Sequence, residues 1–441
     1  TNFIPFQISR ILPAANEQFS SGVSAESIVF GIETALSDLK NGGKLAPFHS
    51  SNFSEGNPII INGLVWMGNK SEMVSRVEDK LNAGFKCIKF KIGGIYFNDE
   101  IDMIRSVRKQ FSVNELEIRL DANESFLTFP EEIENEMVEA LKNTALNRYP
   151  DPMATKLVKG FADYFNVDAD CVTAGNGSDE IISVIMNAFL QKGDKILTLE
   201  PDFSMYRFYA EIAECESVKY QKDENLDVNI DDVLSLANKE KVRIVIFSNP
   251  CNPTSRIVTK DDIRKLINNT DALVVLDEAY MDFAEDESLL GEFNNYDNLI
   301  ILKTCSKALG SAALRLGFAV ANKTLTNVIR AVKSPYNVNS VSQAIGEVLF
   351  SHPDYIDKCI ETVVNSRKDL YNEILKIESD KIEKIFETHT NFVFMKVKNA
   401  KEIFEKMKDN SIIIRNMGDY LRITAGAECE NAKMLEIFKK V

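Results

Sequence analysis

Four side chains suited to carbonyl chemistry follow short apolar runs in the middle of the chain. Lys307 comes after the run LIILKTCS, and Asp277 lies within ALVVLDEAY, with Tyr280 three residues later. Asn252 stands in a Pro-bounded turn after the run VRIVIFSNP. Taken singly, such residues are more often a solvated lysine, a capping aspartate and a turn asparagine. Together they place an amine, a carboxylate beside a buried run and two hydrogen-bond donors at the ends of expected strands.

A second group of residues is suited to bind an anion. The turn GNGSDE places Gly177 and Ser178 ahead of an expected helix, where backbone N–H groups favour negative charge. Arg315 lies in the small-residue stretch GSAALRLG, which lets backbone and ligand approach closely. Thr304 and Ser306 add two hydroxyl groups. Because a glycine-containing turn alone is a weak signal, the prediction depends on the whole set.

The two groups together meet the needs of one cofactor, pyridoxal 5'-phosphate. This cofactor requires a lysine for a Schiff base, a carboxylate for its ring nitrogen, donors for its phenolic oxygen and a phosphate site. Lys307, Asp277, the pair Asn252 and Tyr280, and Arg315 supply these groups in that order. The residues therefore predict a pyridoxal-phosphate enzyme.

The elements that position these residues follow from the apolar pattern. The runs KILTLEP, VRIVIFSNP, ALVVLDEAY and LIILKTCS are short and continuous, as expected of buried parallel strands. Residues 131–143, 155–167 and 178–190 have the apolar spacing of helices. Ligands of open α/β sheets bind beyond the carboxyl ends of the strands, which is where the polar residues lie. The expected fold class is α/β.

Seven segments carry a family resemblance: LDANESF, NRYPDP, GNGSDE, SNPCNPT, DEAYMDF, CSKALGSAALRLGF and YLRITAG. They resemble histidinol-phosphate aminotransferase, a fold-type I family, and cover nearly all of residues 119–441 in the family's order. The resemblance implies a large, mostly parallel-sheet domain over residues 119–330, which binds the cofactor, and a small α/β domain over residues 331–441. It also implies transamination of L-histidinol phosphate with 2-oxoglutarate, giving imidazole-acetol phosphate and glutamate, in histidine biosynthesis.

The resemblance also implies a role for each matching residue. Lys307 would hold the cofactor and move a proton between cofactor and substrate carbons, Asp277 would pair with the ring nitrogen, and Asn252 and Tyr280 would bond the phenolic oxygen. Lys307, Asp277 and Tyr280 are the expected catalytic residues. The cofactor phosphate would be held by Gly177, Ser178, Asp179, Thr304, Ser306 and Arg315.

Further implied roles concern the cofactor ring, the substrate and a partner subunit. Phe203 would stack on the cofactor ring, where many relatives have tyrosine. Tyr149 would reach the phosphate of a partner subunit, which implies a homodimer. Arg415 and Arg422, at expected strand ends, would bind the substrate anions, and Asn123 would also contact the substrate. Surface charge is the alternative interpretation of the two arginines.

The chain departs from the family in two places. The turn NPTS carries Ser255 where the family usually has glycine. The family's N-terminal segment, which helps to close the substrate site, is replaced by other sequence. INGLVWMG, CIKFKIG and LEIRLDAN, within residues 22–123, resemble the start of o-succinylbenzoate synthase of the enolase superfamily.

That second resemblance implies an incomplete β/α-barrel fragment over residues 1–118. Its three expected strands alternate with expected helices at residues 71–85 and 97–111. Lys91 would be the synthase's base and Asp121 a magnesium ligand. A full barrel takes about 250 residues, and one carboxylate does not make a magnesium site. We therefore expect no synthase activity. We interpret the chain as a fusion of this fragment with an aminotransferase.

The composition argues against several other kinds of protein. A formal charge of −15 over 441 residues disfavours a nucleic-acid partner. No apolar stretch reaches the roughly 20 residues of a membrane span, and the first residues lack the pattern of a secretory signal. Seven scattered cysteines without a CxxC pair indicate a reducing cytoplasm, and the three histidines lie too far apart to suggest a metal site.

Three alternatives remain open at this point. A threonine-phosphate decarboxylase and an aromatic aminotransferase would use the same cofactor. The third is a fusion made inactive by the lost N-terminal segment.

Overall fold

The computed structural model describes residues 63–65, 88–90, 118–119, 122–284 and 287–440. Contacts divide the chain into two units, Thr1–Ser112 and Val113–Val441. In the first unit, β1 (Gly63–Val65) pairs in parallel with β2 (Ile88–Phe90). The helices expected within residues 1–118, together with Lys91 and Asp121, lie outside the described residues.

The strand expected as the third of the barrel fragment belongs to the second unit. β3 (Ile118–Arg119) pairs in parallel with β13 (Ile412–Ile413), near the C-terminus. This pairing ties the chain just before Asn123 to the end of the protein that carries Arg415.

A seven-stranded mixed sheet forms the centre of the second unit, in the order β4-β10-β9-β8-β7-β5-β6. Strands β5 to β9 run parallel, whereas β10 is antiparallel to both β9 and β4. The strands are β4 (Val172–Asn176), β5 (Lys195–Glu200), β6 (Glu216–Gln221), β7 (Ile244–Ser248), β8 (Leu273–Asp277), β9 (Leu299–Thr304) and β10 (Leu316–Ala321). The four runs predicted as buried parallel strands are confirmed as β5, β7, β8 and β9.

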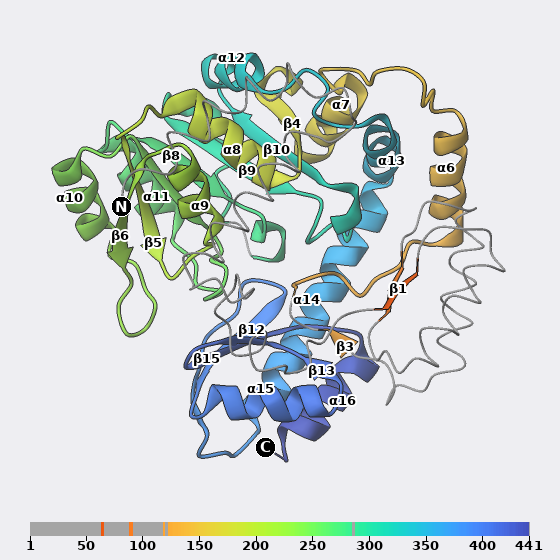
Figure 1. Ribbon diagram of the computed structural model, residues 1–441, viewed down its shortest axis with the longest axis vertical. Coiled ribbons are helices and arrows are strands. Elements are labelled where there is room, and N and C mark those ends of the chain that lie inside the picture. The colour runs from red at the N-terminus through yellow and green to blue at the C-terminus, as the bar shows by residue number, and fades with distance from the viewer. Residues whose placement is uncertain (1–62, 66–87, 91–117, 120–121, 285–286, 441) are drawn as a thin grey trace, which may run out of the picture. The chain divides into compact units, whose positions relative to one another are not determined.

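Helices cover both faces of this sheet (Figure 1), which explains why its strands are continuously apolar. On one face, Ile246 and Ile300 pack with α8 (Ser178–Phe189), α9 (Met205–Ile212) and α12 (Lys323–Val332). On the other face, Val245 and Ile301 pack with α7 (Thr155–Phe165), α10 (Ile230–Glu240) and α11 (Lys260–Asn268). Alternate residues of each strand thus enter two separate cores.

A four-stranded sheet, ordered β11-β12-β15-β14, forms the C-terminal part. Its strands are β11 (Ile382–Ile385), β12 (Phe392–Val397), β14 (Arg415–Met417) and β15 (Tyr420–Thr424). It packs with α15 (Ala400–Asp409) and α16 (Glu428–Phe438) around a core that includes Met395 and Met434. The long helix α14 (Pro353–Leu375) contacts both this sheet and α13 (Ser340–Phe350) of the larger part (Figure 1).

The helices begin where the sequence offers suitable residues. Asn229, Thr259 and Asn339 each accept a bond from a backbone N–H in the first turn of the helix that follows, as good N-caps do. The three helices predicted at residues 131–143, 155–167 and 178–190 are confirmed as α6 (Glu131–Lys142), α7 and α8. Four single-turn helices complete the unit: η1 (Ala169–Cys171), η2 (Met281–Phe283), η3 (Phe293–Asn295) and η4 (Ala312–Leu314). Among the described residues, no helix is long and apolar enough to span a membrane.

Candidate active site

Lys307 lies three residues beyond the end of β9, at the carboxyl edge of the large sheet. Its Nζ donates to the backbone oxygens of Ala122 at 3.0 Å and Asn123 at 3.2 Å. The same nitrogen lies 5.8 Å from the centre of the Tyr280 ring. The lysine is therefore held by polar groups and an aromatic face, with no carboxylate among these contacts.

Asp277 is the last residue of the neighbouring strand β8 and is only 5% exposed. Its Oδ2 accepts from the Tyr206 hydroxyl at 2.8 Å, and its Oδ1 accepts from the Ala279 N–H at 3.1 Å. Burial raises the pKa of Asp277 to about 6. Tyr206 was not predicted, because a tyrosine in helix α9 gives no sign of a partner 71 positions away in the chain.

Asn252 follows β7, the next strand across the sheet. Its Oδ1 accepts from Arg422 Nη1 at 2.6 Å, and its backbone N–H donates to Ser248 Oγ at 3.0 Å. Arg422 is 7% exposed, and its guanidinium lies 5.3 Å from the centre of the Phe392 ring. The strand-end asparagine and the C-terminal arginine are therefore brought together.

Asn123 is hydrogen-bonded to both Tyr280 and Thr424. Its Nδ2 donates to the Tyr280 hydroxyl at 2.8 Å, and both side chains are buried. Thr424 Oγ1 in turn donates to Asn123 Oδ1 at 3.0 Å. Thr424 is a second residue that the sequence did not reveal.

The residues predicted to bind an anion lie around the N-terminus of α8, where Gly177 is the N-cap and Ser178 the first helical residue. Gly177 has a φ of 84°, a conformation that favours glycine, and a Cβ there would lie 2.8 Å from Arg315 Nη2, so a larger residue would be strained and would move the arginine. Arg315 Nη2 also donates to Asp179 Oδ2 at 3.4 Å. Gly317 of β10 is constrained more tightly, because its Cβ would lie 2.3 Å from the Ser178 backbone nitrogen, which cannot move aside as a side chain can.

The two predicted hydroxyl groups also lie at the end of β9. Thr304 Oγ1 donates to Ser306 Oγ at 3.0 Å and accepts from the Ser306 N–H at 3.2 Å. Phe203 follows β5 and packs edge-on against Tyr206, with ring centres 5.5 Å apart. Phe203 therefore packs against the tyrosine that is hydrogen-bonded to Asp277.

Arg415 and Arg422 lie directly opposite each other in the antiparallel pair β14–β15. Directly opposite residues of two strands share one face of the sheet. Arg415 is exposed, whereas Arg422 is buried against Asn252. Two cations in this arrangement repel each other, and a bound anion would offset the repulsion.

None of the hydrogen bonds among the residues above involves Tyr149. It is 81% exposed and stacks on Tyr336, with ring centres 4.5 Å apart. Tyr336, Leu146 and Met153 are also exposed, at 45%, 76% and 40%. Leu146, Tyr149 and Met153 lie within eight residues of one another in the chain, and Tyr149 is joined to Tyr336 by the ring contact.

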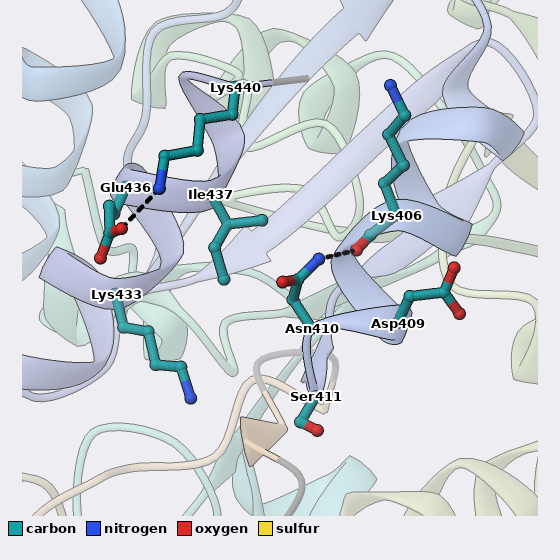
Figure 2. A pocket seen from close by; sticks show the side chains of 8 residues that line it. All are labelled: Lys406, Asp409, Asn410, Ser411, Lys433, Glu436, Ile437 and Lys440. Carbon is teal, nitrogen blue, oxygen red and sulfur yellow. Dashed lines mark hydrogen bonds and ion pairs between the residues drawn. The ribbon is translucent and has the colours of Figure 1, made fainter. Parts of the chain in front are cut away.

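A surface hollow of about 480 Å³ is lined by residues of α15 and α16 (Figure 2). Its lysines are accompanied by carboxylates, and Lys440 Nζ donates to Glu436 Oε1 at 2.6 Å. Asn410 Nδ2 donates to the Lys406 backbone oxygen at 2.8 Å, closing the end of α15. The lining shares no residue with the group around Lys307, so we assign it no role in catalysis.

Comparison with known proteins now decides the family. Residues 112–441 match the family described as aminotransferase class I and II. The chain belongs to this family. Within it, the C-terminal three-quarters of this aminotransferase are homologous to histidinol-phosphate aminotransferases. One of these, from Clostridium novyi (strain NT), is 44% identical over 327 residues, which cover 73% of this chain and 91% of the relative.

Solved structures agree with the fold. The histidinol-phosphate aminotransferase from Clostridium acetobutylicum matches with a TM-score of 0.67 and 26% identity, over 73% of this chain and 98% of that one. The L-threonine-O-3-phosphate decarboxylase from Porphyromonas gingivalis matches with a TM-score of 0.63 over 73% of this chain and 98% of that one. Its 22% identity shows a shared fold only. The aminotransferase therefore has the fold-type I α/β architecture with a mixed sheet.

The cofactor of this aminotransferase is pyridoxal phosphate, and the residues of the site fit it. The buried Asp277 accepts hydrogen bonds from two neutral donors, the Tyr206 hydroxyl and the Ala279 N–H, so its carboxylate is suited to pair with a protonated ring nitrogen. The Gly177–Arg315 approach at the N-terminus of α8 suits a phosphate group. Lys307 extends from the same edge of the sheet, with its amine 5.8 Å from the centre of the Tyr280 ring, and it supplies the primary amine to which the cofactor can attach.

Proposed function

We propose that this aminotransferase transfers the amino group of L-histidinol phosphate to 2-oxoglutarate, giving imidazole-acetol phosphate and glutamate. The observation that carries the proposal is the pairing of Arg415 opposite Arg422, next to the group that contains Lys307. Phosphate and carboxylate are both bound by the forked guanidinium group. Two facing arginines can therefore serve the phosphorylated amine and the dicarboxylic acid in turn.

Lys307 is proposed as the residue that attaches the cofactor and moves the proton at Nζ between the two reacting carbons. When bound, pyridoxal phosphate supplies an electron sink that stabilises negative charge at the substrate carbon. The backbone oxygens of Ala122 and Asn123 orient the Lys307 nitrogen by accepting its hydrogen bonds. The Tyr280 ring limits the directions in which that nitrogen can move.

The strand-end residues are proposed to hold the cofactor in one orientation. Asp277 would keep the ring nitrogen protonated, and Tyr206 would orient that carboxylate through the bond at 2.8 Å. Asn252 and Tyr280 would donate to the phenolic oxygen, while Phe203 would cover the ring. The phosphate would be held by Gly177, Ser178, Asp179, Thr304, Ser306 and Arg315. With its ring and phosphate fixed, the cofactor meets the substrate in one geometry.

A transamination assay tests the proposal. The full chain, loaded with pyridoxal phosphate, is given histidinol phosphate and 2-oxoglutarate, and glutamate formation is followed. Activity is expected with histidinol phosphate, and Lys307→Ala should abolish it. Histidinol without the phosphate should be used at least tenfold less efficiently, because it loses a charged contact of about 1.5 to 3 kcal/mol.

Other outcomes of the same assay would contradict the proposal. Release of carbon dioxide from threonine phosphate without glutamate formation would indicate a decarboxylase. Preference for phenylalanine or tyrosine over histidinol phosphate would indicate an aromatic aminotransferase. No turnover of any of these compounds by the loaded chain would indicate an inactive fusion.

A homodimer is proposed because Tyr149 and Tyr336 form an exposed aromatic stack and because Leu146 and Met153, close to Tyr149 in the chain, are also exposed. Exposed apolar patches of this kind mark association sites. Tyr149 of one subunit would then reach the cofactor phosphate of the other. Sedimentation equilibrium should give twice the chain mass, and Tyr149→Asp should shift the protein toward the monomer.

The organisation of the chain is also a proposal. We propose a cofactor-binding domain over residues 119–330, a small domain over residues 331–441, and a preceding fragment related to o-succinylbenzoate synthase. The parallel pairing of β1 with β2 supports the last point. A cytoplasmic location is supported by the free thiols of the six described cysteines. Two separate intact genes at the source locus would contradict a natural fusion.

A further inference from the structure

Asn123 and Thr424 are joined by two hydrogen bonds, one in each direction, which the sequence did not predict. The Asn123 backbone N–H donates to Thr424 Oγ1 at 3.2 Å, and Thr424 Oγ1 donates to Asn123 Oδ1 at 3.0 Å. Asn123 is 2% exposed and Thr424 is 3% exposed. Asn123 also adopts a positive φ of 55°, which an asparagine tolerates better than most residues.

This pair decides which way the Asn123 carboxamide points. The single hydroxyl proton of Thr424 is donated to Oδ1, so the Asn123 Nδ2 group is directed the other way. There it donates to the Tyr280 hydroxyl oxygen at 2.8 Å. Because the Tyr280 oxygen already accepts a hydrogen bond, its own proton remains available for a different acceptor.

The same asparagine also contacts the lysine of the site. Its backbone oxygen accepts from Lys307 Nζ at 3.2 Å and from Asn391 Nδ2 at 3.1 Å. One residue therefore orients both the Tyr280 hydroxyl and the Lys307 amine. The ionisable Lys307 amine also faces Tyr280, 5.8 Å from the centre of its ring.

Strand β15 reaches both proposed donors to the cofactor's phenolic oxygen. Arg422 and Thr424 are two residues apart in β15, so their side chains lie on the same face. Arg422 bonds Asn252 at 2.6 Å, and Thr424 bonds Asn123, which bonds Tyr280. The small sheet thus contacts Asn252 directly and Tyr280 through Asn123.

We propose that Thr424 is a positioning residue that acts through Asn123 to direct the Tyr280 proton toward the cofactor. The proposal rests on the role proposed above for Tyr280. Without the Thr424 hydroxyl, the Asn123 carboxamide can turn over and present Oδ1 to Tyr280. The Tyr280 proton would then be given to Asn123, and the phenolic oxygen would lose a donor.

The loss has a spectroscopic consequence. A donor on the phenolic oxygen stabilises negative charge there and so lowers the pKa of the bound cofactor. Removing one hydrogen bond of ordinary strength should raise the midpoint of the cofactor's pH-dependent absorption change by about 0.5 to 1 pH unit. A threonine that only tied β15 to the loop at Asn123 would change stability and leave this midpoint where it is.

The test is a pH titration of the absorption spectrum of the loaded, full-length protein, made for five forms. These are the unchanged protein, Tyr280→Phe, Thr424→Val, Thr424→Ser and the double variant with Tyr280→Phe and Thr424→Val. Thr424→Val keeps the shape and removes the hydroxyl, while Thr424→Ser keeps the hydroxyl. If Thr424→Val does not fold, Thr424→Ala supplies the hydroxyl-free form.

The expected result has three parts. Thr424→Val raises the midpoint in the same direction as Tyr280→Phe, Thr424→Ser restores the original value, and the double variant shifts no further than Tyr280→Phe alone. An unchanged midpoint in Thr424→Val, beside a shifted one in Tyr280→Phe, would overturn the role of Thr424. An unchanged midpoint in Tyr280→Phe would instead overturn the role proposed for Tyr280, and the relay with it.

Discussion

Arg415 lies directly opposite Arg422 across the antiparallel pair β14–β15, and Arg422 bonds Asn252 on the large sheet. The two arginines therefore share one face of the small sheet, where one anion could be bound by both guanidinium groups. The small sheet thus carries the two arginines proposed to bind the substrate anions, and one of them also contacts a strand end of the large sheet.

The two arginines should separate activity from stability. Arg415→Gln should lower kcat/KM for histidinol phosphate about 10- to 150-fold, because a charged hydrogen bond to the substrate is lost. The same change should alter the free energy of unfolding by no more than about 0.5 kcal/mol, because Arg415 is exposed. Lys401→Gln, which removes an exposed cation from α15, is the matched control. Equal activity in all three proteins would contradict the substrate-binding role.

Asp277→Asn should change stability in opposite directions with and without the cofactor. Burial raises the pKa of Asp277 to about 6, so the native protein without cofactor binds this proton more tightly than the unfolded chain. The stabilising contribution of the protonated form is complete below pH about 4 and is lost as the pH rises through about 6. At pH 7.5, cofactor-free Asp277→Asn should therefore be more stable than the parent by up to about 3 kcal/mol.

Binding of the cofactor should reverse that order, since only the aspartate can pair with a protonated ring nitrogen. Thermal unfolding at pH 4 and pH 7.5, with and without pyridoxal phosphate, measures both effects. Asp202→Asn is a suitable control, because burial also raises the pKa of Asp202 to about 6 while its bonds run to Ser248. A loss of stability in cofactor-free Asp277→Asn at pH 7.5 would contradict the prediction.

Ser255 joins the turn that carries Asn252 to the loop before β12. It is fully buried, has a φ of 61°, and its Oγ lies 3.1 Å from Thr388 Oγ1 and 2.8 Å from Thr390 Oγ1. Ser255→Ala should lower the free energy of unfolding by about 1 to 3 kcal/mol, because these partners lose their hydrogen bonds. Ser255→Gly loses the same bonds but relieves the left-handed backbone, so it should be about 1 kcal/mol more stable than Ser255→Ala.

Urea denaturation of the three proteins measures this order. Lys241→Gly is the control for backbone relief alone, because Lys241 has a φ of 54° and is exposed. It should be neutral or stabilising. The prediction would be wrong if both Ser255 variants were as stable as the parent.

A protein containing only residues 113–441 should retain full activity. The site residues described here lie between Ala122 and Thr424, within the unit Val113–Val441. Its kcat/KM should equal that of the full chain within a factor of about 2. Neither protein should show o-succinylbenzoate synthase activity. A severalfold gain on truncation would instead show that residues 1–112 obstruct the site.

Sequence reasoning succeeded where the physical signal was local. β7, β8 and β9 are buried on both faces, so each appears in the sequence as an unbroken apolar run that ends at a polar residue. The adjacency of Lys307, Asp277 and Asn252 then follows from parallel strands whose carboxyl ends share one edge. The expected proximity of Lys307 and Tyr280 is also present.

The rest depended on contacts that no local pattern encodes. Tyr206 meets Asp277 only because α9 packs on the same face as the end of β8. Thr424 meets Asn123 across 301 positions of the chain. The strand at Ile118 was assigned by resemblance to a barrel fragment, yet it pairs with β13, since two strand residues carry too little pattern to specify a partner.

Borohydride reduction of the loaded protein, followed by peptide mass spectrometry, tests the central claim most directly. The reaction fixes the cofactor permanently to the lysine that carries it. The account predicts that the modified peptide contains Lys307 and that Lys307→Ala yields no such peptide. A label on another lysine, such as the buried Lys303 four residues earlier, would contradict the assignment of this active site.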